Sequence, residues 1–495
     1  MNKIAIVGIG CVVPGARNKD EFWRKILANA TMTTGIELNN RSDYDDFSIL
    51  SNDNGGKILQ RGFADDWDHL DNTNLSKTEW ESLDPVFRRT LIVVQQALND
   101  CPSMEGKLEK VGMIMGNLGC ITTGSKIQAS NIYHKAISPE MSKLLGSHIQ
   151  FAESQELSHP LNSIPDSGPV NITAKAVGLG GPCFSIDAAC ASSLYVLKLA
   201  ELYLASGAVD AMIAGGVSEV DEYAGANLFN FFGVMPSSGV SAPLNKNSSG
   251  LTLATGGGAF VLKRYEDAVE AGDKIHAVVE AIGWSNDGGK KYILAPDSVG
   301  QQQAYRDAHG KNQSPLDYIE CHATGTQAGD AEEVESIAAH FGKATPLIGA
   351  VKPNIGHTLT ASGMAAMTKV IMAMKHNTIP ATIGLSDPIS SKDRTITSTV
   401  IVTQNTPWPQ TTRAKRAAIN AFGFGGSNGH AIFHEHTEET FKDFRQNPQR
   451  QESKAKNIGF IGLGVHLGSI DNIKDFSKVV FSDIKLGLLP SPLDQ

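Results

Sequence analysis

The chain has 495 residues, of which 41% are hydrophobic and 19% are charged, and this composition is typical of a globular protein with a large core. With a formal net charge of −9 the chain has no overall excess of basic residues, so we expect no nucleic-acid partner. No apolar run is long enough to span a bilayer, and six cysteines without paired spacing indicate a reducing, cytoplasmic location.

Short and nearly continuous apolar runs predict strands that are buried on both faces. They lie at residues 4–10, 111–116, 183–189, 210–217, 258–264, 276–284, 318–323, 347–351 and 417–426. Helical patterns lie between them, at 191–206, 330–341 and 362–376. Strands that alternate with helices predict an α/β layered fold with mostly parallel sheets. The stretch from 120 to 168 is long and irregular.

The predicted helix at 191–206 has the clearest pattern. Leu194, Leu197 and Leu204 form one apolar stripe, and Gly207 is a stop signal. The apolar run at 183–189 comes just before this helix, and Cys190 lies between the two. The positive end of a helix favours a thiolate, and the layout resembles the nucleophile elbow of serine hydrolases. A free cysteine can equally be a small buried hydrophobic residue.

Two histidines strengthen the catalytic interpretation of Cys190. His322 in "ECHATGTQAGD" and His357 in "VKPNIGHTLTASG" each lie between a predicted strand and a predicted helix. The carboxyl ends of strands carry the sites of α/β sheets, so we expect all three side chains to converge. The glycine-rich segment 420–433 can turn tightly and direct an N–H group at a developing oxyanion. No CxxC or HExxH motif is present, and we expect no metal site.

Beyond residue 436 the composition changes. Residues 437–456 are charged and lack apolar periodicity, which predicts a linker. The segment NIGFIGLG at 457–464 then repeats KIAIVGIG at 3–10, with a shift of 457 − 3 = 454. We expect residues 457–495 to be the truncated start of a second copy, in a chain cut from a longer tandem protein or in a split gene. The alternative is a chance likeness between two βα units.

The motifs together resemble those of the β-ketoacyl synthases, the condensing enzymes of fatty acid and polyketide synthesis. The similarity covers essentially residues 1–436, and it is greatest to the synthase module of bacterial polyunsaturated fatty acid synthases and iterative polyketide synthases. In the polyunsaturated fatty acid synthases a second, chain-length-factor module follows the synthase module directly. The resemblance rests on "LDPVFRR" (83–89), "GPCFSIDAACASSL" (181–194), "YIECHATGTQAGD" (318–330), "VKPNIGHTLTASG" (351–363) and "AFGFGGSNGHAIF" (421–433).

This resemblance implies a thiolase-like fold, in which two similar βα halves stack as a five-layered αβαβα sandwich. We place the halves at 1–265 and 266–436. It also implies an acyl carrier protein partner that brings acyl and malonyl groups on its own phosphopantetheine, with no cofactor bound tightly by this chain. A homodimer is expected, or a heterodimer with a chain-length-factor subunit.

The site residues follow from the same resemblance. Cys190 is expected to carry the acyl group, while His322 and His357, as neutral imidazoles, donate to the enolate formed by decarboxylation. Lys352 is expected to support the histidines. The remaining expected roles are an oxyanion hole made by the N–H groups of Cys190 and Phe424, pantetheine binding by Thr324 and Thr326, and gating of the acyl pocket by Phe422 and Phe424.

Two positions depart from the family pattern. Asn245 and Thr255 stand where an aspartate and a glutamate are usual, and those carboxylates could have braced the lysine or the site loops. This keeps open a second function, that of a non-catalytic chain-length factor. A coenzyme A-dependent thiolase is disfavoured by the pattern of one cysteine and two histidines. A nicotinamide enzyme is disfavoured because Gly8-Ile9-Gly10 lacks the rest of the dinucleotide fingerprint.

Overall fold

The structure is a computed structural model, and the chain forms two compact units, Met1–Pro448 and Gln449–Gln495. It describes residues 3–37, 58–62, 75–150, 158–236, 240–290, 292–310, 312, 314–438, 440, 442, 459–467 and 470–480. Within these ranges, no helix has both the length and the hydropathy needed to cross a membrane.

A ten-stranded sheet runs through the first unit. Its first five strands are β1 (Ile4–Val12), β4 (Val111–Asn117), β5 (Cys183–Ile186), β6 (Ala211–Ser218) and β7 (Gly256–Arg264). The next five are β8 (Ala277–Asn286), β9 (Tyr318–Glu320), β10 (Leu347–Gly349), β13 (Arg416–Gly423) and β14 (Ser427–His434). Two small ribbons pair β2 (Thr34–Glu37) with β3 (Ile58–Arg61), and β11 (Thr378–Ile379) with β12 (Thr406–Pro407).

The strand order shows that the sheet consists of two equivalent halves. It reads β10-β9-β13-β14-β8-β1-β7-β6-β4-β5. Within each group of five, the third strand along the chain lies at the outer edge and is followed by the second, fourth, fifth and first. The halves meet where β1 pairs with β8, with Ile4 opposite Val279. Both halves therefore have the same topology, as the predicted pair of similar βα halves requires.

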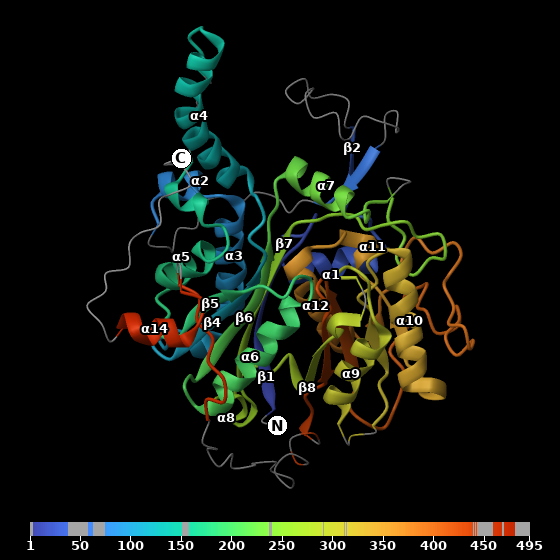
Figure 1. Ribbon diagram of the computed structural model, residues 1–495. Coiled ribbons are helices and arrows are strands. Elements are labelled where there is room, and N and C mark those ends of the chain that lie inside the picture. Colours follow the sequence, from blue (N-terminus) through green and yellow to red (C-terminus); the bar gives the residue numbers. More distant parts are fainter. Residues whose placement is uncertain are drawn as a thin grey trace. The chain divides into compact units, whose positions relative to one another are not determined.

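Helices complete five layers around the two half-sheets (Figure 1). On one outer face α3 (Pro85–Asn99) contacts β1, β6 and β7, and α5 (Gly168–Val177) contacts β4 and β5. On the other, α9 (Ser298–His309) contacts β8 and β14, and α10 (Gln327–Phe341) contacts α9. The central layer holds α6 (Ser192–Ser206) and α12 (Ser362–His376), each of which contacts strands of both halves.

The central layer is apolar because it is covered on both sides. Leu194, Leu197 and Leu204 of α6 are buried in one core cluster with Met367 of α12 and strand residues of both halves. The predicted stripe is therefore confirmed. Gly207 caps α6 with φ = 74°, a left-handed conformation that costs glycine nothing, so the predicted stop signal is also confirmed.

The prediction of mostly parallel sheets is wrong. β9 is parallel to β10 and β13, and β4 is parallel to β5 and β6, but all the pairs that involve β1, β7, β8 or β14 are antiparallel. Hydrophobicity shows that a strand is covered on both faces, but it carries no information on the direction of its neighbour. The middle of the ten-stranded sheet is antiparallel and is still buried on both faces.

The stretch from 120 to 168, which showed no pattern in the sequence, contains a long helix. This helix, α4 (Thr123–Leu145), is 23 residues long and projects from the body of the unit in Figure 1. Of its residues only Gly124 is buried, which explains why it has no apolar stripe. The remaining α-helices that the structure describes in the first unit are α1 (Lys19–Leu27), α2 (Lys77–Ser82), α7 (Glu222–Phe231), α8 (Tyr265–Glu270) and α11 (Lys352–Ile355).

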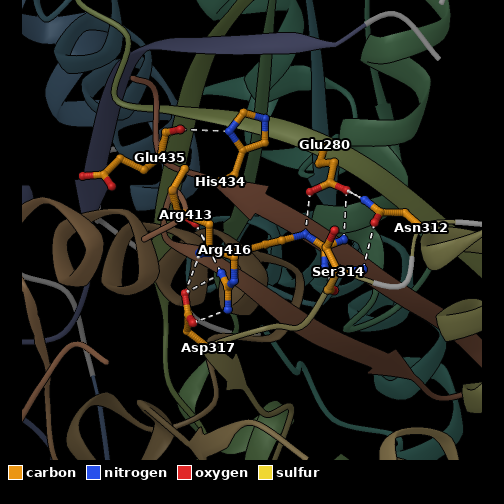
Figure 2. A network of polar contacts seen from close by, with 9 residues as sticks. Glu280, Asn312, Ser314, Asp317, Arg413, Arg416, His434 and Glu435 are labelled. Atoms are coloured by element: carbon orange, nitrogen blue, oxygen red, sulfur yellow. Dashed lines mark hydrogen bonds and ion pairs between the residues drawn. The ribbon is translucent and has the colours of Figure 1, made fainter. Parts of the chain in front are cut away.

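A network of ion pairs joins β8 to the start of β13 (Figure 2). The Arg416 guanidinium donates to both oxygens of Glu280, at 2.7 and 2.9 Å, and also to the Ser314 carbonyl. Asp317 accepts from the Arg413 guanidinium at 2.6 Å and from the Arg416 N–H at 2.9 Å. Burial alone would raise the pKa of Glu280, but Arg416 outweighs burial and lowers it.

The second unit contains α14 (Ile473–Val480). Asn472 caps this helix by accepting from the Asp475 N–H at 3.0 Å. Asn18 caps α1 in the same way, by accepting from the Glu21 N–H at 2.9 Å. The two caps differ in number by 472 − 18 = 454, the shift of the repeat found in the sequence. The predicted boundaries at 265, 436 and 456 stay predictions.

Candidate active site

Cys190 lies in a tight turn between β5 and α6. Ser192 fixes this turn, since its hydroxyl accepts from the Ala188 N–H at 2.9 Å and donates to the Ala189 carbonyl at 2.6 Å. Ala189 has φ = 49°, in the left-handed region that side chains other than glycine rarely adopt. The small residues of the turn permit this bend, and the bend places Cys190 at the start of the central layer.

His322 lies just beyond the end of β9, in the loop that leads to α10. The carboxylate of Glu333, on α10, accepts from the N–H groups of His322 and Ala323, both at 2.7 Å. Ala323 has φ = 35°, so the backbone beside the histidine is also strained. A buried carboxylate therefore holds the loop that carries His322.

His357 follows β10 and the single turn of α11. Its N–H donates to the Thr252 carbonyl at 2.7 Å, and its Nδ1 accepts from the Leu359 N–H at 3.2 Å. An acceptor Nδ1 has no proton, so in the neutral ring the proton is on Nε2. The Nε2–H of His357 is thus available as a donor.

These three side chains converge, as the sequence predicts. The Cys190 sulfur and one ring nitrogen each of His322 and His357 lie within 4.8 Å of one another. The two imidazole rings meet edge to face, with centroids 5.3 Å apart. Segments that are 322 − 190 = 132 and 357 − 322 = 35 residues apart in the chain thereby form one site. The catalytic roles of these residues stay a proposal.

Burial controls the charge of all three groups. It lowers the pKa of both His322 and His357 well below the usual value, and the nearby charge of Lys352 adds to this, so both imidazoles are neutral. Burial also raises the pKa of the Cys190 thiol to about 12, and the charge of Lys352 opposes that only in part. Loss of solvation therefore opposes the effect that we expect from the helix end, which favours the thiolate.

Lys352 lies behind the cluster and is buried. Its ammonium group donates to the carbonyl oxygen of His322. Burial lowers the pKa of Lys352, and the charges of Glu333, Glu320 and Asp330 oppose that change. Lys352 therefore bonds to the backbone of the loop that carries His322 and not to an imidazole ring, and its role in supporting the histidines stays a proposal.

Sequence reasoning missed two of these carboxylates, Glu320 and Glu333. Glu320 accepts from the Val351 N–H at 2.6 Å and pairs with Lys369 at 2.8 Å. Its carboxylate therefore fixes the residue before Lys352. Both glutamates lie within or just after the motif at 318–330, and a carboxylate in an apolar strand or on the buried face of a helix is the signal that could have revealed them.

A cavity of about 450 Å³ opens onto the cluster. Cys190, His322 and His357 lie in its wall, together with the predicted Thr324, Thr326, Phe422 and Phe424. The two threonine hydroxyls are 2.9 Å apart. Phe422 packs against His322 with ring centroids 5.7 Å apart, and Phe424 packs against Phe232 at 6.0 Å. Every predicted site residue except Lys352 therefore faces one cavity.

Hydrogen bonds at the two departures from the family pattern go to the segment 384–387 and to Gly62. The Asn245 amide donates to the Ser386 hydroxyl at 3.1 Å and accepts from the Asp387 N–H at 3.2 Å. The Thr255 N–H donates to the Gly62 carbonyl at 2.8 Å. Asn245 thus supports the neighbouring 384–387 segment, while the carboxylates near Lys352 come from other positions.

The chain matches known families over most of its length. Residues 1–268 match the family described as beta-ketoacyl synthase, N-terminal domain, and residues 276–386 match its C-terminal domain. Residues 396–457 match the ketoacyl-synthetase C-terminal extension.

The chain is also similar to parts of larger proteins. A polyunsaturated fatty acid synthase of Thraustochytrium sp. has a subunit that is 34% identical over 99% of this chain, which spans 24% of that protein. A phenolphthiocerol/phthiocerol polyketide synthase of Mycobacterium tuberculosis has a subunit that is 30% identical over 88% of the chain, which spans 28% of it. This chain therefore corresponds to about a quarter of the length of either relative.

Solved structures agree with the fold. The chain is 34% identical to the PfaC keto synthase–chain length factor, with a TM-score of 0.85, covering 97% of this chain and 52% of that one. A ketosynthase from module 6 of the bacillaene synthase of Bacillus subtilis is 25% identical, with a TM-score of 0.71, covering 88% and 72%. The predicted thiolase-like fold is confirmed, and the chain belongs to the β-ketoacyl synthase family.

Proposed function

We propose that this chain catalyses the decarboxylative Claisen condensation of an acyl group on Cys190 with a malonyl group that an acyl carrier protein presents as a thioester. The observation that carries the proposal is the convergence of a thiol and two neutral imidazoles within 4.8 Å, in the wall of one cavity. The relatives named above are synthases of polyunsaturated fatty acids and of polyketides, so the product belongs to one of these lipid classes or to fatty acids.

The first step moves the acyl group to the enzyme. The Cys190 sulfur attacks the carbonyl carbon of the acyl thioester, and the bond from that carbon to the carrier's sulfur breaks. The proton that leaves Cys190 ends on the departing carrier thiol. Because burial raises the pKa of Cys190 to about 12, the resting group is the thiol, and its proton leaves during this step. The positive charge of Lys352 favours the developing thiolate.

The second step forms the nucleophile. The malonyl thioester loses carbon dioxide, and the electron pair of the broken bond becomes an enolate whose oxygen carries the negative charge. The Nε2–H of His357 can donate to this oxygen because its Nδ1 is already bonded to the Leu359 N–H. His322, which is also neutral, is the second donor. A neutral donor stabilises the enolate without giving up its proton to it.

In the third step the enolate carbon attacks the acyl-Cys190 carbonyl and the bond from that carbon to the Cys190 sulfur breaks. The sulfur then takes a proton from solvent, which regenerates the thiol. We assign the oxyanion of this step to the N–H groups of Cys190 and Phe424, since both residues line the cavity. Such a donor contributes about 3 kcal/mol in other enzymes. Thr324 and Thr326, on the same cavity wall, would hold the amides of the carrier's phosphopantetheine through their hydroxyls.

Acyl loading tests this proposal directly. Incubation with a mass-tagged acyl carrier should add one acyl group to Cys190, and later addition of malonyl carrier should release carbon dioxide and form an extended β-ketoacyl carrier. The measurements are intact mass and trapped carbon dioxide. His322→Ala should lower carbon dioxide release more than loading, because the imidazole acts on the enolate. A chain that stays unloaded, while a control ketosynthase is acylated, would instead be a chain-length factor.

The low pKa values of the histidines predict the response of decarboxylation to pH. A folded-state pKa well below 6.5 means that both rings gain a proton only in more acidic solution than a free histidine does. We therefore expect kcat for malonyl decarboxylation to stay level from pH 8 to about pH 6.5 and to fall only below that. The measurement is carbon dioxide release at saturating malonyl carrier. A fall centred on pH 6.5 would show that the rings are solvated.

We further propose that residues 457–495 begin a second ketosynthase-like module, after a linker at 437–456. In β1, Ile6, Val7 and Ile9 are buried, whereas Phe460 and Ile461, which correspond to Ile6 and Val7 by the 454-residue shift, are 96% and 103% exposed. Such side chains need the rest of a sheet to cover them. The similarity to the PfaC keto synthase–chain length factor covers 97% of this chain, which supports the proposal.

A dimer, with a second copy or with a chain-length-factor subunit, is the assembly we propose. β5 lies at the edge of the ten-stranded sheet, and its four residues are only partly buried. An edge strand of this kind is a template for pairing with another chain. α4 adds exposed apolar side chains, among them Ile132, Tyr133 and Leu144.

All six cysteines are free, which fits the cytoplasmic location that we propose.

A further inference from the structure

A chain of polar contacts leads from the strand β14 to the loop of His322. We propose that His430 is a positioning residue that acts on His322 through Asn420 and Glu333. The ring nitrogen Nδ1 of His430 lies 2.7 Å from the amide oxygen of Asn420, and the amide nitrogen of Asn420 lies 2.8 Å from Glu333. Glu333 in turn holds the backbone of His322. This inference rests on the function proposed above, in which His322 acts on the enolate.

The end of this chain is a strained backbone. Ala323 is held at φ = 35°, a backbone conformation that alanine rarely adopts unless its surroundings fix it. Both oxygens of Glu333 fix it here, through the N–H groups of His322 and Ala323 at 2.7 Å each. Any shift of the Glu333 carboxylate would release this loop and move the His322 ring.

Glu333 itself needs a third donor. It is buried, and burial raises the pKa of its carboxyl group, while hydrogen bonds from Ala323, Asn420 and His322 oppose the rise. A buried carboxylate is retained only when hydrogen bonds satisfy its oxygens. The Asn420 amide nitrogen makes such a bond, to the same carboxylate oxygen that accepts from the His322 N–H, so it helps to set where the carboxylate lies.

His430 decides which way the Asn420 amide points. The amide can donate to Glu333 only if its oxygen faces His430, and that oxygen then requires a donor. His430 Nδ1 is the donor, so the neutral ring has its proton on Nδ1 and none on Nε2, which is buried and has no hydrogen-bond partner among the described residues. A flipped amide would place its oxygen against the Glu333 carboxylate and repel it.

The rest of the His430 surroundings is packing and offers a matched control. The ring stacks on His309 with centroids 5.6 Å apart and meets Tyr305 edge to face at 4.7 Å. His309 is a member of the same ring cluster, whereas the side-chain hydrogen bonds of Asn420 go to Tyr305, Glu333 and His430. Replacing His309 therefore disturbs the packing of the cluster without touching the polar chain.

Two substitutions distinguish the effect of the hydrogen-bond donor of His430 from the effect of the packing of its ring. His430→Phe keeps a ring and removes the donor, while His430→Asn keeps an N–H near the position of Nδ1 and removes the ring. We expect His430→Phe to lower kcat for malonyl decarboxylation about tenfold, as for a lost buried hydrogen bond, with KM changed less than about twofold. His430→Asn should recover kcat to within about threefold of the unsubstituted chain, and His309→Phe should leave kcat unchanged.

Acylation of Cys190, followed by intact mass, should be nearly unchanged in all three variants, because the role proposed for His322 is on the enolate and not in loading. Equal losses of kcat in His430→Phe and His430→Asn, or a parallel loss of Cys190 loading, would overturn the inference. Either result would show that the ring matters only for packing.

A second measurement needs no variant that might unfold. In the full chain labelled with ¹⁵N and ¹³C at histidine, the ring of His430 should give the shifts of a neutral imidazole protonated on Nδ1, the minor tautomer in water. A ring protonated on Nε2, or on both nitrogens, would overturn the inference. If the tautomer is as expected but the unsubstituted chain releases no carbon dioxide from malonyl carrier, then the proposed function fails and the contact of His430 with Asn420 stands.

Discussion

Replacing Cys190 with alanine should abolish condensation while leaving malonyl decarboxylation measurable. The substitution removes the sulfur that accepts the acyl group, and no other described thiol lines the cavity. Formation of the extended product should therefore fall by at least about 10³-fold. His322, His357 and the cavity walls remain, so the enolate can still form. Product formation is followed by mass spectrometry of the carrier and decarboxylation by trapped carbon dioxide.

The matched control for this variant is Cys101→Ala. Cys101 is also a buried thiol, but it packs in the core of the first half, far along the chain from the residues that line the cavity. Its loss should lower the unfolding midpoint slightly and leave condensation intact. A Cys190→Ala protein that still gains an acyl adduct would place the nucleophile elsewhere and contradict the proposed mechanism.

Replacing Arg416 with leucine should produce the largest loss of stability of any substitution considered. Arg416 and Glu280 are both largely buried, and the guanidinium contacts both carboxylate oxygens (Figure 2). Removing one member of such a pair leaves the other charge buried without its partner, which costs roughly 3–5 kcal/mol. The measurement is the midpoint of unfolding in urea, compared with that of the unsubstituted chain.

Arg413→Leu is the control from the same network. Arg413 is 31% exposed. When its guanidinium is lost, its partner Asp317 still accepts hydrogen bonds from the N–H groups of Arg416 and Trp408. We expect a cost of about 1 kcal/mol. The double substitution Arg416→Leu with Glu280→Leu should recover part of the loss, because no unpaired charge is then buried. If Arg413→Leu were as harmful as Arg416→Leu, burial of the charge would not be the cause.

The elements that sequence reasoning located well are those whose patterns are local. The apolar stripe of α6 and its glycine cap depend on residues a few positions apart, and both are present in the structure. Cys190, His322 and His357 could be found because each lies beyond the end of an apolar run, which is where α/β sheets carry their sites. The helix α4 was missed because only Gly124 in it is buried, so its sequence needs no apolar stripe.

The sequence by itself determined the α/β class, the family motifs and the identity of the side chains in the cavity, because these depend on residue type and local spacing. Only the tertiary structure decided the antiparallel middle of the sheet, the raised pKa of Cys190 and the carboxylates Glu320 and Glu333 behind the site. Strand direction, loss of solvation and buried hydrogen bonds all arise between segments that are distant in the chain. These features form only when the two halves pack around the central helices.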